Sequence, residues 1–398
     1  MPNPICPELK KELNDIKTLK QEFDFELENA LNSKDTKKAQ ELRKELEAKI
    51  ESIQNKLWPF ETLEKKKIEE QYNEQKEVME KNGIIEKLSN GEMGIRGIDP
   101  EDINKEKEYV FPKLEDILKK MKEKKEILEI KAEQGFNQLL IVPFGMKLDD
   151  LIEKYKQILW KHYKEKKLFA TMKNSKEQPK FPDDLPFEQD KIDKIKSGEI
   201  KYENIWDDKN KAVYVWQDEY KNAEAENKIV YYPEKFDPDP EIHKGKTKQE
   251  ILKKQEEENP ATAGFEIFLV EDLPNIPREG QGKEVGKGEN KRKQLETNEK
   301  PRDYLEKIKN NPQYKNEKGQ TPETQIIYAI QYLEKHNQVI DDYEGNGSAS
   351  YQIGVYFAVS GDVPSACWYR GYLQARLGRG VPGLSDSDGG VRSVAMVF

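Results

Sequence analysis

"GDVPSACWYRGYLQARLGRGVPGLSDSDGGVRS", residues 361–393, differs in composition from the chain that precedes it. Before about residue 340 the sequence is crowded with Lys and Glu, but neither residue type occurs after Glu344. Gly, Ser, Asp, Tyr and Arg replace them in the C-terminal tail, residues 345–398, between single apolar residues. Among the apolar residues, those that recur at regular intervals are Val363, Trp368, Leu373, Leu377, Val381, Val391, Val394 and Val397. Such interleaving is typical of short strands and turns, so we expect the tail to be folded.

The composition of the whole chain limits its architecture. Of 398 residues, 36% are charged and 35% are hydrophobic, which suits exposed helices with a smaller globular unit better than one large core. The net charge of −9 gives no reason to expect general binding to nucleic acid or anionic lipid. No apolar run approaches the roughly 20 residues that span a bilayer. The N-terminus lacks the features of a signal peptide. We therefore expect no membrane partner.

Cysteine and histidine usage argues against a disulfide scaffold or a metal site. Cys6 and Cys367 lie at opposite ends of the chain, which favours a reducing cytoplasm as its compartment. The three histidines, His162, His243 and His336, have no metal-ligand spacing. We therefore expect no metal and no cofactor.

Two short motifs bear on whether the chain binds phosphate or calcium. "GQGKEVGKG", residues 280–288, lacks the residue order of a phosphate-binding loop. Asp386 and Asp388 could ligate calcium. A turn in which Asp and Ser side chains form hydrogen bonds with the nearby backbone also explains "SDSDGG", and we favour it.

The N-terminal region is predicted to be helical. Residues 5–31 and 39–57 carry apolar side chains at steps of three and four, which indicates two amphipathic helices. A short polar turn between them predicts an antiparallel hairpin, followed by a third helix over 63–79. A small bundle and an oligomerising coiled coil both fit, and the short repeat favours the bundle.

The middle of the chain gives weaker signals. Helices are predicted at 112–134 and 147–168, separated by the apolar turn "FNQLLIVPFGM", residues 136–146. Irregular connection is predicted over 176–229, with a strand within 211–220.

The segment that leads into the tail gives stronger signals. A helix is expected at 247–257, a strand at 264–272 and a loop without periodicity at 278–300. The helix at 321–338 has Thr321 as its N-cap and Pro322 at its first position. Its predicted apolar face is Ile326, Ile327, Ile330 and Leu333.

At this point the chain shows a resemblance to a known family. Residues 338–398, together with "YYPEKFDPDP", "FLVEDLPNIP" and "TPE" upstream, resemble the end of variable proteins made by diversity-generating retroelements. The resemblance covers about 230–398 and is sharpest from Gly345 onward. It implies a C-terminal C-type lectin domain of the formylglycine-generating-enzyme-like branch. It also implies that an error-prone reverse transcriptase rewrites adenine-rich codons, which would explain an alphabet of Tyr, Ser, Asp, Gly and Arg without Lys and Glu.

The resemblance divides the tail into displayed and scaffold positions. The displayed, ligand-binding positions that it implies are Asp362, Ser365, Cys367, Tyr369, Tyr372, Arg376, Gly378, Arg379, Gly380, Gly383, Leu384, Asp386 and Asp388. The scaffold positions are Val363, Pro364, Trp368, Gln374, Ala375, Pro382, Gly390, Val391, Arg392 and Ser393. Enzymes of the same branch use a pair of copper-binding cysteines. The tail holds only Cys367, so no enzymatic activity is expected.

The sequence therefore predicts an α+β protein. The expected segments are a helical hairpin or coiled coil over 1–90, further helices over 91–175, irregular connection over 176–229 and a C-type-lectin-like domain over 230–398 whose variable region is about 355–398. We expect non-enzymatic binding of an unknown protein ligand, with a possible homo-oligomer through the N-terminal helices. One alternative is nucleic-acid binding through Arg370, Arg376, Arg379, Arg392, Tyr369 and Tyr372. The other is a structural coiled-coil oligomer.

Overall fold

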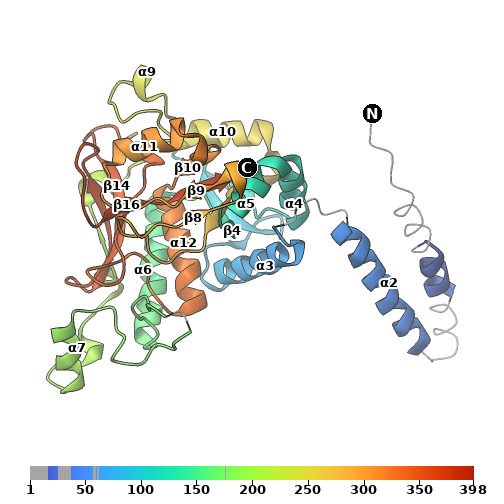
Figure 1. Ribbon diagram of the computed structural model, residues 1–398, viewed down its shortest axis with the longest axis horizontal. Coiled ribbons are helices and arrows are strands. Elements are labelled where there is room, and N and C mark those ends of the chain that lie inside the picture. The colour runs from blue at the N-terminus through green and yellow to red at the C-terminus, as the bar shows by residue number, and fades with distance from the viewer. Residues whose placement is uncertain (1–16, 26–36, 57–59, 61, 175) are drawn as a thin grey trace. The chain divides into compact units, whose positions relative to one another are not determined.

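The computed structural model describes residues 17–25, 37–56, 60, 62–174 and 176–398, and it divides into two compact units, Met1–Lys65 and Lys66–Phe398 (Figure 1). In the first unit, residues 17–25 are helical and α2 spans Lys37–Lys56. Helix α2 confirms the described part of the helix predicted over 39–57. Arg43 Nε and Glu47 Oε1 form an ion pair at 2.8 Å across one of its turns. The predicted turn between the first two helices lies outside the described residues, and oligomerisation stays a prediction.

A four-stranded antiparallel sheet, in the order β10–β17–β7–β4, runs through the second unit. The strands are β10 (Glu317–Gly319), β17 (Ser393–Met396), β7 (Glu266–Glu271) and β4 (Phe136–Val142). Strand β7 confirms the strand predicted over 264–272. Strand β4 corrects the turn predicted at 136–146. An apolar run that is buried on both faces does not alternate, so periodicity does not identify it as a strand.

The same sheet joins segments that the sequence placed in different regions. Strand β4 comes from 91–175 and β7 from 230–398, and Leu139 lies opposite Leu269 with both side chains fully buried. The two segments therefore share one core. The mixture of helices and several sheets confirms the α+β class.

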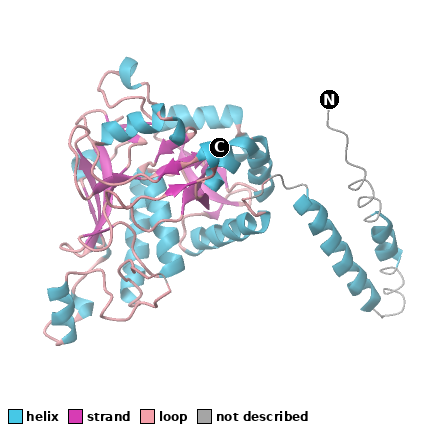
Figure 2. Cartoon of the chain, viewed as in Figure 1, coloured by secondary structure: helices cyan, strands magenta, loops and turns pink. Residues whose placement is uncertain are grey.

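Helices α6 (Leu148–Lys164) and α12 (Pro322–His336) pack against each other, and α12 also contacts β4 (Figure 2). Helix α12 begins as predicted, because Thr321 Oγ1 accepts a hydrogen bond from the Thr324 backbone nitrogen at 3.3 Å and Pro322 follows the cap. Asn337, with φ of 56°, ends it in the left-handed conformation. The predicted apolar face is buried at Ile326, Ile327, Ile330 and Leu333.

A second, mixed sheet is built mainly from the tail. Its order is β16–β12–β14–β15–β5, and β11 pairs with β14 from outside this path. The strands are β16 (Gly389–Val391), β12 (Ala349–Tyr351), β14 (Val363–Tyr369), β15 (Gln374–Gly380), β5 (Val213–Val215) and β11 (Asp342–Tyr343). Strand β5 confirms the strand predicted within 211–220 and pairs in parallel with β15. The tail is folded, as its interleaved apolar residues predicted.

Smaller elements complete the second unit. The remaining strands are β1 (Glu86–Lys87), β2 (Met93–Ile98), β3 (Glu106–Val110), β6 (Ile229–Tyr231), β13 (Val355–Phe357), β8 (Glu284–Val285) and β9 (Arg292–Lys293). The remaining α-helices are α3 (Lys65–Lys81), α4 (Leu114–Glu123), α5 (Lys125–Glu133), α7 (Gln189–Lys196), α8 (Gln217–Tyr220), α9 (Pro240–His243), α10 (Lys248–Glu258) and α11 (Pro301–Asn310). Helices α3, α6 and α10 confirm their predictions, whereas the helix predicted at 112–134 is divided at Lys124. Across the described parts of the chain, no helix combines the length and the apolar character needed to cross a bilayer.

The segment 278–300, predicted as a loop, is fixed by a buried charged cluster. Arg292 Nε and Nη2 donate to the two carboxylate oxygens of Glu317 at 2.8 and 2.9 Å. Lys131 Nζ donates to Glu317 at 2.6 Å and Ser393 Oγ donates to it at 2.5 Å. A buried guanidinium needs partners of this kind. The cluster therefore ties β9 to β10, β17 and α5, a long-range contact that local periodicity cannot reveal.

Candidate functional site

Strands β14 and β15 form an antiparallel hairpin that contains many of the displayed positions. The register pairs Ser365 with Gly378 and Cys367 with Arg376. At the turn, Leu373 has φ of 57°, and its carbonyl accepts a hydrogen bond from Trp206 Nε1 at 2.9 Å. Contacts from outside the hairpin therefore hold its turn in place.

One face of the hairpin is packed into the protein. Trp368 is 2% exposed, and its Nε1 donates to the Pro186 carbonyl at 2.5 Å. The other buried side chains on this face are Pro364, Ala366, Ala375 and Leu377. Residues directly opposite in an antiparallel pair lie on the same side of the sheet, so this set forms one apolar layer. The scaffold position Trp368 lies in that layer.

The opposite face carries the fully buried Val363 at one end and polar and aromatic side chains from Ser365 to the turn. Ser365, Cys367, Tyr369 and Arg376 belong to it, and all four are half-buried. Tyr372, beside the turn, is 66% exposed, and its ring centroid lies 4.9 Å from that of Tyr369. We call these five residues the outer face of the hairpin.

Two tyrosines that the sequence analysis did not single out extend the outer face. Tyr343 on β11 lies opposite Tyr369 in the register, and their rings stack with centroids 5.2 Å apart. Tyr214 on β5 lies opposite Arg376, whose guanidinium is 5.7 Å from the Tyr214 centroid and 5.9 Å from that of Tyr369. The aromatic alternation in 211–220 was visible in the sequence, but its strand partner was not.

Cys367 on the outer face is a neutral thiol. Burial raises its pKa to about 12, because a thiolate loses hydration in this position. A reactive cysteine needs the opposite shift.

Three displayed positions, Asp362, Gly378 and Gly380, do not fit an exposed role. Gly378 is buried. Asp362 is 6% exposed and forms an ion pair with Arg379 Nη1. At Gly380, a Cβ atom would lie 2.4 Å from Cε1 of Tyr351, so a side chain there must move the Tyr351 ring. The composition of the tail does not reveal these contacts, because both depend on neighbours elsewhere in the fold.

The other displayed positions lie near the hairpin or in the loop after it. Arg379 is exposed, and its guanidinium lies 4.8 Å from the Trp216 ring centroid. A Cβ at Gly383 would meet only Arg302 Nη1, at 3.8 Å. Leu384 is 64% exposed.

Within "SDSDGG", residues 386–389 form the turn favoured from the sequence, and Gly389 and Gly390 begin β16. Asp386 Oδ1 accepts a hydrogen bond from the Asp388 backbone nitrogen at 2.9 Å, and Asp388 also forms an ion pair with Arg278. Among the described residues, no group of three or more His, Cys, Asp or Glu is arranged to hold a metal ion.

The other scaffold positions are mostly buried. Arg392 is 8% exposed and forms an ion pair with Asp341. A Cβ at Gly390 would lie 2.8 Å from Ile276 Cγ2, which explains the need for glycine there. The remaining buried positions are Val363, Pro364, Ala375, Val391 and Ser393, whereas Gln374 and Pro382 are half-buried.

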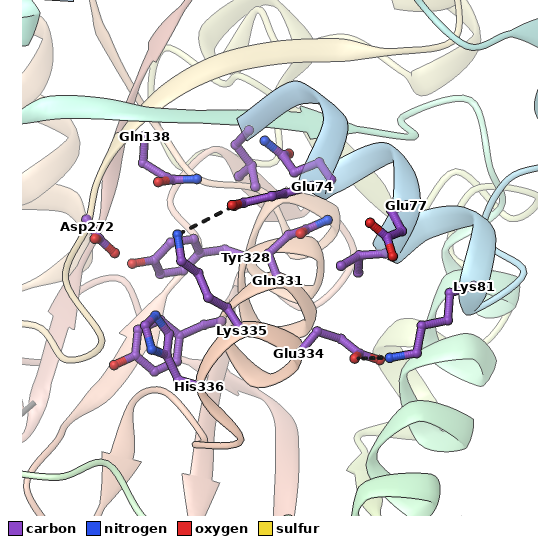
Figure 3. Close-up of a pocket in the computed structure, with 14 residues that line it drawn as sticks. Glu74, Glu77, Lys81, Gln138, Asp272, Tyr328, Gln331, Glu334, Lys335 and His336 are labelled. Atoms are coloured by element: carbon purple, nitrogen blue, oxygen red, sulfur yellow. Dashed lines mark hydrogen bonds and ion pairs between the residues drawn. The ribbon is translucent and has the colours of Figure 1, made fainter. Parts of the chain in front are cut away.

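A separate cavity of about 260 Å³ is lined by residues of α3, α12 and β4 together with Asp272 (Figure 3). Two ion pairs join its walls, Lys81 Nζ to Glu334 Oε2 at 2.8 Å and Lys335 Nζ to Glu74 Oε2 at 3.6 Å. Glu334 also accepts a hydrogen bond from Asn82 Nδ2 at 2.7 Å. The cations and carboxylates in these contacts therefore neutralise one another.

Comparison of the chain with models of protein families, with curated proteins and with solved structures finds no match.

Proposed function

We propose that this protein is a non-enzymatic, ligand-binding variable protein of the diversity-generating retroelement type. In this proposal the C-terminal region folds as a C-type-lectin-like domain and binds another protein through the outer face of the hairpin. The observation that carries the proposal is the division of β14 and β15 into an apolar inner layer and a polar, aromatic outer face. Side chains on such an outer face can change while the inner layer maintains the fold.

The chemistry of the outer face favours a protein ligand. Tyr and Arg provide large contact areas and anchor many protein interfaces. The rings of Tyr214 and Tyr369 lie beside the Arg376 guanidinium, and those of Tyr343 and Tyr372 pack against Tyr369.

The alternative function is nucleic-acid binding, which the stacked tyrosines favour because aromatic side chains can stack on bases. The arginines of the tail favour it less. Arg370 Nε and Nη2 each donate to an oxygen of Asp342 at 2.7 Å, and Arg379 and Arg392 are paired with Asp362 and Asp341. These carboxylates neutralise the charges that would bind phosphate, so we favour the protein ligand.

Sequencing the 3′ end of the gene in sister isolates would test the proposed function. We expect a reverse-transcriptase gene nearby and a template copy of the tail, with substitutions at the codons for Ser365, Cys367, Tyr369 and Arg376. The codons for Trp368 and Leu377 should be constant, because these side chains are buried. Substitutions spread evenly over both sets, or the absence of a template copy, would contradict the proposal.

The protein ligand is tested separately with the variant Tyr369→Ser/Tyr372→Ser/Arg376→Ser. The triple variant should no longer bind a protein ligand that was isolated with the wild-type chain. Its melting temperature should be unchanged, since the three side chains lie on the outer face. Arg379 is left in place because it pairs with the buried Asp362. Binding to a protein should depend weakly on salt, whereas binding to phosphates should weaken steeply.

Multivalency through the N-terminal helices is part of the same proposal. Several weak binding faces on one oligomer bind more tightly than one face. Sedimentation of the full chain should show concentration-dependent assembly. A strictly monomeric chain would leave the intramolecular bundle as the better account and would remove the structural-oligomer alternative.

A further inference from the structure

A second cavity, also of about 260 Å³, is lined by residues of α10, β10 and β17 and by no residue of the outer face of the hairpin. Its ionisable lining includes the lysines Lys244, Lys246, Lys254 and Lys318 and the carboxyl groups Glu258 and Glu266. The chain as a whole has a net charge of −9. The excess of lysine at this cavity is therefore a local feature that opposes the overall charge.

Of the four lysines that line the cavity, Lys318 on β10 is the least exposed to solvent. Its Nζ lies 4.3 Å from the ring centroid of Tyr232 and 3.5 Å from Met396 Sδ. Burial lowers its pKa, the charge of Glu266 partly opposes this shift, and the charges of Lys254 and Lys246 lower the pKa further. Within the described residues no carboxylate lies within ion-pair distance of its ammonium group. A partly desolvated cation without a direct ion pair is costly, so this site favours an added negative charge.

The carboxyl groups of the cavity compensate Lys318 only weakly. Glu266 is buried, and both of its oxygens lie within hydrogen-bond distance of the Tyr232 hydroxyl, at 2.8 and 2.7 Å. Burial raises the pKa of Glu266 to about 7, so its carboxylate is a weaker counter-charge near neutral pH than that of an exposed glutamate. Glu258 lies 3.6 Å from Lys254 in an exposed pair, which contributes little.

Apart from the amides Gln255 and Asn259, the remaining walls of the cavity are apolar or aromatic. Tyr232, Ile251, Met396 and Phe398 line it together with the lysines. A site with an apolar wall and a few converging polar groups suits a small molecule whose two ends differ in polarity.

We propose that this cavity binds a small organic anion, with its carboxylate or phosphate group at Lys318 and its apolar group against Tyr232, Met396 and Phe398. Lys246 and Lys254 add attraction at the mouth of the cavity, where both side chains are exposed. The anion supplies the counter-charge that Glu266 supplies only in part. This proposal is independent of the outer face of the hairpin and of the protein ligand proposed for it.

The test uses the full chain and four small probes, each of which contains a single benzene ring. Benzoate and phenyl phosphate carry the two acidic head groups, benzyl alcohol is neutral and benzylamine is cationic. Isothermal titration and ligand-observed NMR should show binding of at least one anion, about tenfold tighter than the alcohol or the amine, because charge-assisted hydrogen bonds discriminate by about this factor. The relative affinity of the two anions identifies the preferred head group.

Variants then locate the binding site. Lys318→Met keeps the aliphatic stem and should weaken anion binding by about tenfold or more, and the exposed Lys254→Gln should weaken it by about threefold. Lys253→Gln is the matched control, because Lys253 precedes Lys254 on α10 but pairs with Glu101 at 2.9 Å outside the cavity. Lys253→Gln and Arg376→Ala should bind the anions as the wild type does.

These measurements decide whether the cavity is an anion-binding site. No binding of either anion, equal binding of all four probes, or anion binding that is unchanged in both Lys318→Met and Lys254→Gln would overturn the proposal. If Lys318→Met does not fold, Lys254→Gln decides the question, since its side chain is exposed and its loss should not affect folding.

Discussion

The guanidinium of Arg392 is held by the carboxylate of Asp341, with Nη2 2.6 Å from Oδ1 and Nε 3.2 Å from Oδ2. Asp341 is fully buried and also accepts a hydrogen bond from Gln325 Nε2 at 2.7 Å. Arg392 Nη1 donates to the Leu273 carbonyl, and the guanidinium lies 5.3 Å from the Tyr328 ring centroid. This pair joins the end of the tail to α12 and to the segment after β7.

Arg392→Ala should therefore lower the free energy of unfolding by about 3 kcal/mol or more, because it leaves a buried carboxylate without its partner. Urea unfolding at neutral pH measures the loss. Arg376→Ala is the control, since this guanidinium lies over tyrosine rings on the outer face, and it should change stability by only about 0.5 kcal/mol. Equal effects of the two changes would contradict the assignment of Arg392 to the scaffold.

Trp368 anchors the inner layer of the hairpin. Trp368→Ala removes a 2% exposed indole and its hydrogen bond to Pro186, so it should cost about 3–5 kcal/mol of unfolding free energy. Thermal and urea unfolding should both report the loss. The control is Tyr372→Ala, which should leave the unfolding transition almost unchanged because the Tyr372 side chain is 66% exposed. A tail that is not packed would give the same melting temperature for both variants.

Two glycines of the tail should differ in their tolerance of a methyl group. Gly380→Ala places Cβ 2.4 Å from the ring of Tyr351 and should cost about 1–3 kcal/mol, the usual range for overpacking. Gly383→Ala meets only Arg302 Nη1 at 3.8 Å and should be nearly neutral. Unfolding free energies of the two single variants test this difference. A neutral Gly380→Ala would restore Gly380 to the displayed set.

The elements that the sequence predicted well are those with local signals. Helix α12 has a Thr–Pro start and a regular apolar face, and β7 is a long run rich in β-formers, so each is visible without its neighbours. Strand β4 was missed because Leu139–Val142 is a continuous apolar run, which periodicity does not assign to a strand. A long-range contact with β7 decides its conformation.

The candidate site was predictable only in part for the same reason. The alternation of Cys367, Trp368 and Tyr369 places side chains on opposite faces of a strand, and the sequence contains this information. The sequence does not show that Tyr214 and Tyr343 lie beside them, because this depends on pairing with strands outside the hairpin. The burial of Asp362 likewise depends on its contact with Arg379 and the surrounding fold.

Glu266 should make the stability of the protein depend on pH. Its folded pKa is about 7, above the ordinary value of 4.5, because burial penalises the carboxylate. Between these two values the folded state binds more protons at this group than the unfolded state does, so the free energy of unfolding falls as the pH rises. The stabilising contribution is fully present below about pH 4.5 and is lost as the pH rises through about 7.

Glu266→Gln removes this titration and keeps an oxygen that can accept the Tyr232 hydroxyl hydrogen bond. The free energy of unfolding of the variant minus that of the wild type should therefore increase from pH 5 to pH 8. Over the full titration this difference should change by about 3 kcal/mol. Urea unfolding across this range measures the difference, and Glu258→Gln, an exposed side chain of the same cavity, controls for the change of net charge. The carboxyl ¹³C shift of Glu266 should titrate near pH 7. A titration near 4.5 with a pH-independent stability difference would show that the carboxylate is solvated despite its buried position.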